Sequence, residues 1–239
     1  MLKAWQFREL NQDIGGGVFD KMINLVSIVE GVDYETIANK KPKELIELYK
    51  KAQELCRLDL NNKDQIKIKN KTLTLINMNM LSLGQFIHLE SLVNEGEKKN
   101  VSKIAACLYV QTTGGNMIDL DYEPYEKINV DFRAGEIDEL YINDIWGAVV
   151  KYLKFRKSFF DSYEIFNDPY KDVNVEKLTD EEKEIYNEEM NAREKTKGRQ
   201  YENILNILSN KRLIDFPEIL RMNLFLCFNQ LSFLQSETE

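Results

Sequence analysis

Residues that interrupt regular secondary structure are scarce in this sequence, which has four prolines and 11 glycines among 239 residues. Proline breaks a helix because it lacks a backbone donor, and an ordered glycine costs conformational entropy. Their scarcity leaves room for long helices. With 43% hydrophobic and 30% charged residues, the chain has the composition of a folded protein that buries a core. We therefore expect a compact, mainly helical domain.

Apolar residues recur at helical spacing along most of the chain, and residues that favour helix starts precede several of these stretches. Pro42 is a good first-turn residue. Ser82 with Gln85, and Thr179 with Glu182, have the spacing of a capping box. The ranges predicted to be helical are 18–30, 33–37, 42–55, 82–93, 101–110, 143–160, 179–197, 204–208 and 224–234.

Residues 65–76 depart from this pattern because polar and apolar residues alternate there with a period of two. Such alternation around a short turn predicts a β-hairpin, and asparagine tolerates the left-handed backbone that two-residue turns require. We place the turn at Asn70 and Lys71. A single hairpin is marginally stable, so it must pack on helices or pair with another strand. The residues predicted to face the core are Ile66, Ile68, Leu73 and Leu75. The predicted fold class is thus mainly α with a small hairpin, an α+β fold.

Three regions follow from these patterns. Residues 1–17 look like an N-terminal arm that ends in a glycine joint, since Trp5 and Phe7 are large and apolar but lie outside any periodic stretch. Residues 18–165 form the helical core with the hairpin. Residues 166–239 form a C-terminal helical region, in which the highly charged helix at 179–197 is expected to protrude into solvent. A frayed terminus is the other interpretation of the first segment.

Composition argues against several classes of function. A net charge of −8 and a pI near 5.0 disfavour binding to nucleic acid, which needs a basic field. No apolar run reaches the length of a membrane span, and the first residues lack the apolar core of a signal peptide. The odd number of scattered cysteines is typical of reduced, packed thiols in a cytosolic protein. These are Cys56, Cys107 and Cys227.

Motifs that carry catalysis or bind cofactors do not occur in the sequence. His88 is its one histidine, and the surrounding pattern favours a packed or surface position on a helix over a catalytic one. The carboxylates at residues 119–123 resemble the start of a calcium loop, but Pro124 stands where that loop needs glycine. Transition-metal ligand spacings and phosphate-binding loops are missing too. We therefore expect no catalytic residue, no metal and no cofactor, and we interpret the chain as a non-enzyme.

Several short segments resemble one family. Residues 74–90 read TLINMNMLSLGQFIHLE, and residues 103–109 read KIAACLY. Residues 122–125 read YEPY, residues 132–134 read FRA, and residues 145–150 read IWGAVV. Together they are similar to the hairpin and helices of tailed-phage tail assembly chaperones and related small virion assembly proteins. The family usually continues its second helix with Arg-Pro, where this chain has Val110 and Gln111. The resemblance covers residues 66–160.

The resemblance implies a non-catalytic bacteriophage morphogenesis protein that binds other phage structural subunits. The surface of such a protein would shield an aggregation-prone partner, such as a tape-measure, tail or portal-proximal subunit. It also implies a homo-oligomer or ring that acts in the host cytoplasm during assembly. The residues that we assign to partner binding are Trp5, Phe7, Tyr163 and Phe166. Two alternatives stay open: a structural component of the virion held by its N-terminal arm, and an enzyme with an unfamiliar site.

Overall fold

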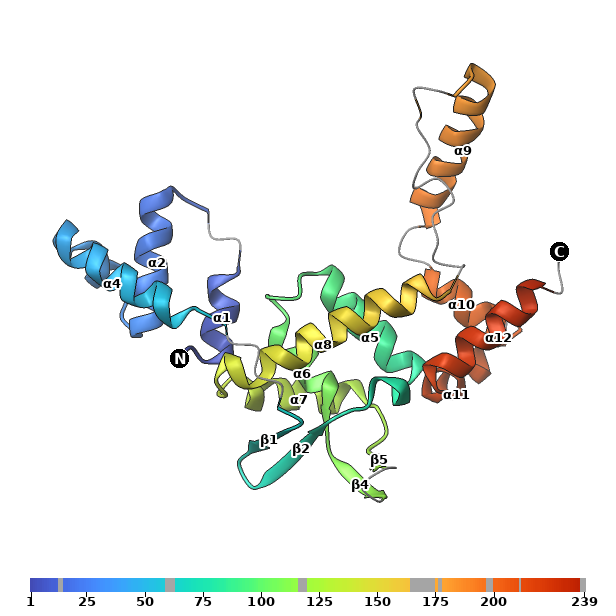
Figure 1. Ribbon diagram of the computed structural model, residues 1–239, viewed down its shortest axis with the longest axis horizontal. Helices are drawn as coiled ribbons and strands as arrows, with labels where there is room; N and C mark the ends of the chain where they lie inside the picture. The colour runs from blue at the N-terminus through green and yellow to red at the C-terminus, as the bar shows by residue number, and fades with distance from the viewer. Residues whose placement is uncertain are drawn as a thin grey trace. The chain divides into compact units, whose positions relative to one another are not determined.

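The computed structural model describes residues 1–12, 15–58, 63–115, 120–163, 175, 178–196, 200–210 and 212–236. The chain divides into two compact units (Figure 1). Unit 1 comprises Met1–Met80 and His88–Lys154, and unit 2 comprises Leu81–Ile87 and Phe155–Glu239. The predicted α+β class, mainly helical with a small β component, is confirmed. The division differs from the predicted one, because two long helices, α5 (Leu83–Asn94) and α8 (Ile142–Asp161), each contribute to both units.

Unit 1 begins with four helices, three of which form a small cluster with its own core. Figure 1 shows α2 and α4 packed side by side, with α1 next to α2. The predicted helices at 18–30 and 42–55 are confirmed, and Asp33 caps the short helix between them by accepting a hydrogen bond from the Thr36 amide. The bounds are α1 Ala4–Leu10, α2 Val18–Glu30, α3 Tyr34–Ala38 and α4 Pro42–Leu55. The buried residues of the cluster are Ile23, Val26, Ile37, Leu45 and Ala52.

Residues 1–12 differ from the expected arm. Phe7 is only 6% exposed, and its ring packs on that of Trp146 with centroids 5.4 Å apart. Arg8 and Asp138 form an ion pair of 2.7 Å, and Lys3 pairs with Tyr141 through an isolated β-bridge. The sequence around Phe7 hides this role because the ring contact of Phe7 and the ion pair of Arg8 are to residues 130 or more positions away, and a two-turn helix is too short to show periodicity.

The predicted hairpin is confirmed as β1 (Gln65–Ile68) and β2 (Lys71–Leu75), paired antiparallel with Ile66 opposite Leu73. All four residues predicted to face the core are buried. The turn is one residue earlier than predicted, at Lys69 and Asn70, and Lys69 adopts the left-handed conformation with a φ of 51°.

A third strand, β3 (Tyr109–Val110), completes the sheet in the order β1-β2-β3. The helix predicted over 101–110 therefore ends earlier, as α6 (Val101–Leu108), because its last two residues pair with β2 instead. The chain then forms β4 (Thr112–Gly115) and β5 (Leu120–Tyr122), a separate antiparallel pair, and α7 (Lys127–Ile137). Sequence reasoning predicted none of these last three elements.

Unit 2 is built around Phe86 at the start of α5. This side chain is fully buried, and the ring centroids of Phe159, Phe160, Tyr201 and Phe228 lie 5.1 to 6.4 Å away. Gly84 brings the start of α5 close to the helix α11 (Phe216–Arg221), since a Cβ at this position would lie 3.0 Å from the Leu220 carbonyl oxygen. The remaining elements of the unit are α9 Asp180–Thr196, α10 Gln200–Leu208, the 3-10 turn η4 Leu213–Asp215, α11 Phe216–Arg221 and α12 Leu224–Ser236.

Both predicted capping boxes have the hydrogen bond from a backbone amide in the first turn to the hydroxyl of the capping residue. The Gln85 amide donates to the Ser82 hydroxyl at 3.2 Å, and the Glu182 amide donates to the Thr179 hydroxyl at 3.3 Å. The Glu182 carboxylate in turn accepts from the Thr179 amide at 2.7 Å, so α9 starts as predicted. Among the helices that the structure describes, none is both long and apolar enough to cross a bilayer.

Candidate interaction surfaces

The four residues assigned to partner binding occupy different environments. Phe7 lies in the core of unit 1, and Trp5 on the same helix is half-buried. Tyr163 belongs to unit 2, where its ring packs on Phe228 and its hydroxyl donates to the Asn229 side chain at 2.9 Å. Burial raises the pKa of Tyr163. Phe166 lies outside the described residues. Trp5 and Phe7 thus belong to unit 1 and Tyr163 to unit 2. The most exposed apolar side chains of each unit belong to other residues.

The outer face of α7 is the clearest accessible apolar surface of unit 1. Ile128 is 75% exposed and Phe132 69% exposed, one turn apart on the same face. Gly135 follows on that face, and a Cβ placed there would meet no atom within 4 Å. The opposite face is buried through Val130 and Ile137. The helical spacing of these buried residues was the signal that could have revealed α7 in the sequence.

Arg133 anchors the inner face of α7. Its guanidinium donates to the carbonyl oxygens of Ala106 and Tyr109, both at 2.8 Å, and forms an ion pair with Glu123. Arginine suits this position because its planar fork holds several donors in fixed directions. A second ion pair, Lys69 to Glu136 at 2.7 Å, joins the turn of the hairpin to the same helix. These contacts fix which side of α7 faces outward.

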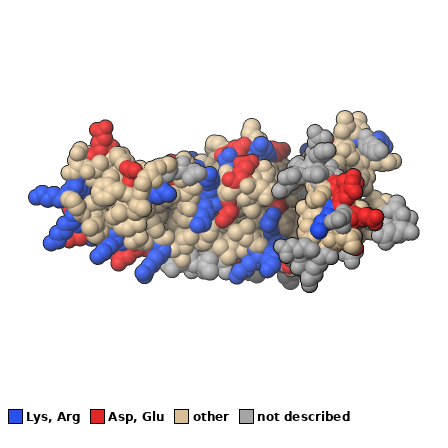
Figure 2. All heavy atoms as spheres, turned by 90° about the horizontal axis from the view of Figure 1, so that it is seen from above, with Lys and Arg blue, Asp and Glu red and all other residues tan. Residues whose placement is uncertain are grey.

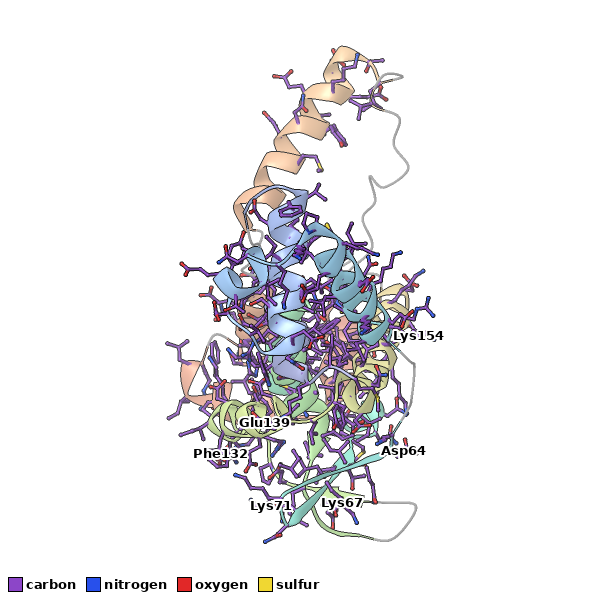
Figure 3. The ribbon with its side chains drawn as sticks, turned by 90° about the vertical axis from the view of Figure 1, so that its left-hand side faces the viewer. Asp64, Lys67, Lys71, Phe132, Glu139 and Lys154 are labelled. Atoms are coloured by element: carbon purple, nitrogen blue, oxygen red, sulfur yellow. The ribbon has the colours of Figure 1, made fainter. Side chains whose placement is uncertain are left out.

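A pocket of about 120 Å³ lies between α7 and the hairpin. Ile68 and Leu73 provide its apolar floor, and the exposed Phe132 forms part of its wall. Figure 3 shows Lys67 and Lys71 on the hairpin and Phe132 and Glu139 on the α7 side of unit 1. The volume is that of about four water molecules, so the pocket has room for one side chain rather than for a cofactor.

His88, Cys107 and Tyr125 form a cluster in unit 1 whose atoms resemble a nucleophile and a base. The Cys107 sulfur lies 3.7 Å from His88 Nδ1, and the Tyr125 hydroxyl is 2.5 Å from the same nitrogen. Cys107 is fully buried, and burial raises its pKa far above the ordinary range. A thiol must ionise to act as a nucleophile, so the cluster holds a neutral, packed thiol. Burial also lowers the pKa of His88, with a smaller contribution from Lys127.

Unit 2 carries a second accessible apolar surface on its C-terminal helices. Leu213 is 73% exposed and Ile214 78% exposed in the turn η4, and Leu226 on α12 is 61% exposed. The opposite face of α12 is buried through Phe228 and Leu231, so this helix is apolar on both sides. A helix that is apolar all round is normally covered on all sides. The exposed side of α12 is therefore a candidate contact surface.

Charged residues of both signs are mixed on one face of the molecule. On the face shown in Figure 2, the described Lys and Arg side chains occur together with Asp and Glu. That face thus presents mixed charge rather than the basic field that favours nucleic acid. Within the described part of the chain, no group of three or more His, Cys, Asp or Glu side chains is placed to hold a metal ion.

Comparison with known proteins finds no match for the chain among protein-family models, curated proteins or solved structures.

Proposed function

We propose that the chain is a non-catalytic bacteriophage morphogenesis protein, similar in role to tail assembly chaperones, that binds structural subunits through its C-terminal helices. The resemblance of residues 66–160 to that family supports the class of function. The observation that carries the proposal is the exposure of Leu213, Ile214 and Leu226 in unit 2.

Covering these three side chains with a partner would contribute to the free energy of binding. Burying one large aliphatic side chain stabilises a complex by about 1.5–3 kcal/mol, so covering all three contributes about 4–9 kcal/mol before the costs of association. A micromolar complex corresponds to about 8 kcal/mol. Because the costs of association are still to be subtracted, these three side chains supply only part of the free energy of a micromolar complex, and further contacts must supply the rest.

The binding surface is tested by co-expressing the chain with tape-measure and tail subunits of tailed phages. We expect the natural chain to keep one of them soluble and to co-elute with it. The double substitution Leu213→Asp and Ile214→Asp should abolish co-elution without unfolding the chain, because both residues are already in solvent. Phe19→Asp in α2 is the matched control, since Phe19 is 54% exposed in unit 1. A double variant that still captures the subunit would show that this surface is not the binding site.

The alternative of a virion component held by its N-terminal residues is tested separately. In this structure Phe7 packs on Trp146 of the same chain, which leaves its ring occupied. Mass spectrometry of purified particles distinguishes the two roles. A chaperone is absent from the particle or present only in traces, whereas a structural component is present in a fixed ratio to the other subunits.

A further inference from the structure

We infer that the pocket between α7 and the hairpin binds the carboxylate of an acidic side chain from a partner polypeptide, with Lys71 as the cation that pairs with it. This goes beyond the proposed function, because the pocket belongs to unit 1 and the proposed binding surface belongs to unit 2. Three features of the pocket carry the inference: its balance of charges, its hydrogen-bond donors, and its apolar floor and wall.

The charges in the pocket leave one cation without a partner. Of the two carboxylates that line it, Glu123 already pairs with Arg133. The other, Glu136, pairs with Lys69. Lys71 also lines the pocket, and among the residues that the structure describes it forms no ion pair. A ligand with a single negative charge would therefore balance the pocket.

The register of the hairpin determines which lysine can reach the ligand. Lys71 is paired with Ile68, and residues paired across two strands share a face of the sheet. Ile68 belongs to the floor of the pocket, so the side chain of Lys71 starts from that same face. Lys67 precedes Ile68 by one position and starts from the opposite face. Both lysines are exposed on the hairpin (Figure 3), which makes Lys67 a matched lysine outside the pocket.

Hydrogen-bond donors accompany the cation. An ionised carboxylate only accepts hydrogen bonds, and its two oxygens accept several. The ammonium group of Lys71 and the side-chain amides of Gln111 and Asn129 all line the pocket. The Asn129 amide nitrogen donates to Glu126 at 3.4 Å and has a second N–H to offer. Three side chains can thus donate to one bound carboxylate.

The apolar parts of the pocket favour a polypeptide over a free acid. Ile68 and Leu73 are 5% and 4% exposed and form a floor on which the methylene groups of a glutamate can pack. Phe132 forms part of the wall and is 69% exposed. A small acid in the pocket would leave most of this ring in water, whereas a polypeptide that enters beside it would cover the ring and gain the free energy of burying it.

Other ligand classes fit these charges less well. A cation would face the unpaired ammonium group of Lys71. A phosphate dianion would bring a second negative charge toward Glu123 and Glu136, with one unpaired cation to offset it. A neutral amide would fit the volume but would replace a charge-assisted hydrogen bond by a neutral one, which is roughly half as strong.

Methyl NMR of the full chain tests the site directly, because the Ile68 and Leu73 methyl groups form the floor. The probes are two capped peptides that carry a central glutamate or a central glutamine between alanines, titrated at constant ionic strength. Both floor residues should show saturable shifts with the glutamate peptide. Its affinity should exceed that of the glutamine peptide about tenfold, the contribution of a hydrogen bond between charged groups.

Two lysine variants assign this preference to the pocket. Lys71→Met should bind both peptides equally, because the preference depends on its charge, whereas Lys67→Met should keep the tenfold ratio. Comparing ratios rather than affinities isolates the pairwise interaction from any small change in the shape of the pocket. A preference for glutamate that survives in Lys71→Met, or that disappears in Lys67→Met, would overturn the inference.

Small anions distinguish the source of the ligand. Sodium propionate carries the same carboxylate without a polypeptide, so it should shift the same methyl groups but bind more weakly than the glutamate peptide. Equal affinity of propionate and peptide would mean a site for free acids, and tighter binding of inorganic phosphate than of propionate would mean a general anion site. Either result, or no shift at Ile68 and Leu73 with the glutamate peptide, would refute the inference. Because only the chain and these probes are present, failure here leaves the proposed surface of unit 2 untouched.

Discussion

Replacing Arg133 with methionine should destabilise unit 1 strongly, although the volume of the side chain is largely kept. The guanidinium satisfies the Ala106 and Tyr109 carbonyl oxygens, and both residues are fully buried. Ala106 belongs to the last turn of α6, where carbonyl groups lack a partner within the helix. Arg133 therefore caps this helix from a distant element.

The size of the effect follows from these contacts. A buried carbonyl that loses its donor costs about 1–3 kcal/mol, and two are affected. The Glu123 side chain is 21% exposed and its carboxylate can be hydrated on its open side. Losing its ion-pair partner therefore costs less stability than it would for a fully buried charge. We expect a loss of about 3–5 kcal/mol, the range found when one partner of a buried ion pair is removed. Glu123→Gln, which keeps an acceptor for Arg133, should cost clearly less.

Tryptophan fluorescence during urea unfolding is the appropriate assay, because Trp5 and Trp146 are the two tryptophans of the chain and both belong to unit 1. Lys67→Met on the exposed hairpin face is the control, and its effect should stay within about 0.5 kcal/mol. A loss below about 1 kcal/mol for Arg133→Met would refute the reasoning. It would mean that water or backbone groups satisfy the two carbonyls without the guanidinium.

Three further outcomes follow from buried groups. Burial lowers the pKa of His88 below its usual 6.5, so in mild acid the unfolded chain binds more protons than the folded one, and stability should fall as the pH drops through 6.5. His88→Gln should flatten the dependence of the urea midpoint on pH in this range. Phe86→Ala should lower the free energy of unfolding of unit 2 by about 3–5 kcal/mol, which hydrogen exchange of its helices measures. Exchange rates that stay unchanged after the substitution would contradict the central role of this ring. Cys56 should react with a thiol reagent in the native chain, whereas Cys107 and Cys227 should react only after unfolding, which mass spectrometry of the labelled peptides can check.

The hairpin shows what local patterns can predict. Its apolar face was predictable because the alternation of Ile66 and Ile68 with lysines is contained within the strand itself. Its turn was misplaced by one residue, since Lys69 takes the left-handed conformation that asparagine more often adopts. The bounds of α2 and α4 were predictable for the same local reason, as both combine an apolar stripe with a start signal.

Elements that depend on distant contacts were not predictable in this way. Tyr109 and Val110 continue the apolar run of α6, and only their pairing with Thr74 and Leu75 makes them a strand. Phe7 belongs to the core because Trp146 is beside it. The α7 surface was missed because the exposed Ile128 and Phe132 are as apolar as the buried Val130 and Ile137, so the sequence alone does not tell which of these sides faces the core.

The assignment of Leu81–Ile87 to unit 2 has a consequence for how the chain is made. Phe86 leaves the ribosome before the segment that begins at Phe155, and residues 88–154, which come between them, belong to unit 1. At about 5–20 residues per second, the ring waits on the order of 4–15 s for Phe159, and on the order of 7–28 s for Phe228, the last of its aromatic neighbours. During that interval unit 1 can complete its sheet and its buried arginine cap, while the apolar start of α5 stays uncovered. Unit 2 is thus assembled last, on a helix that the earlier unit has already set in place.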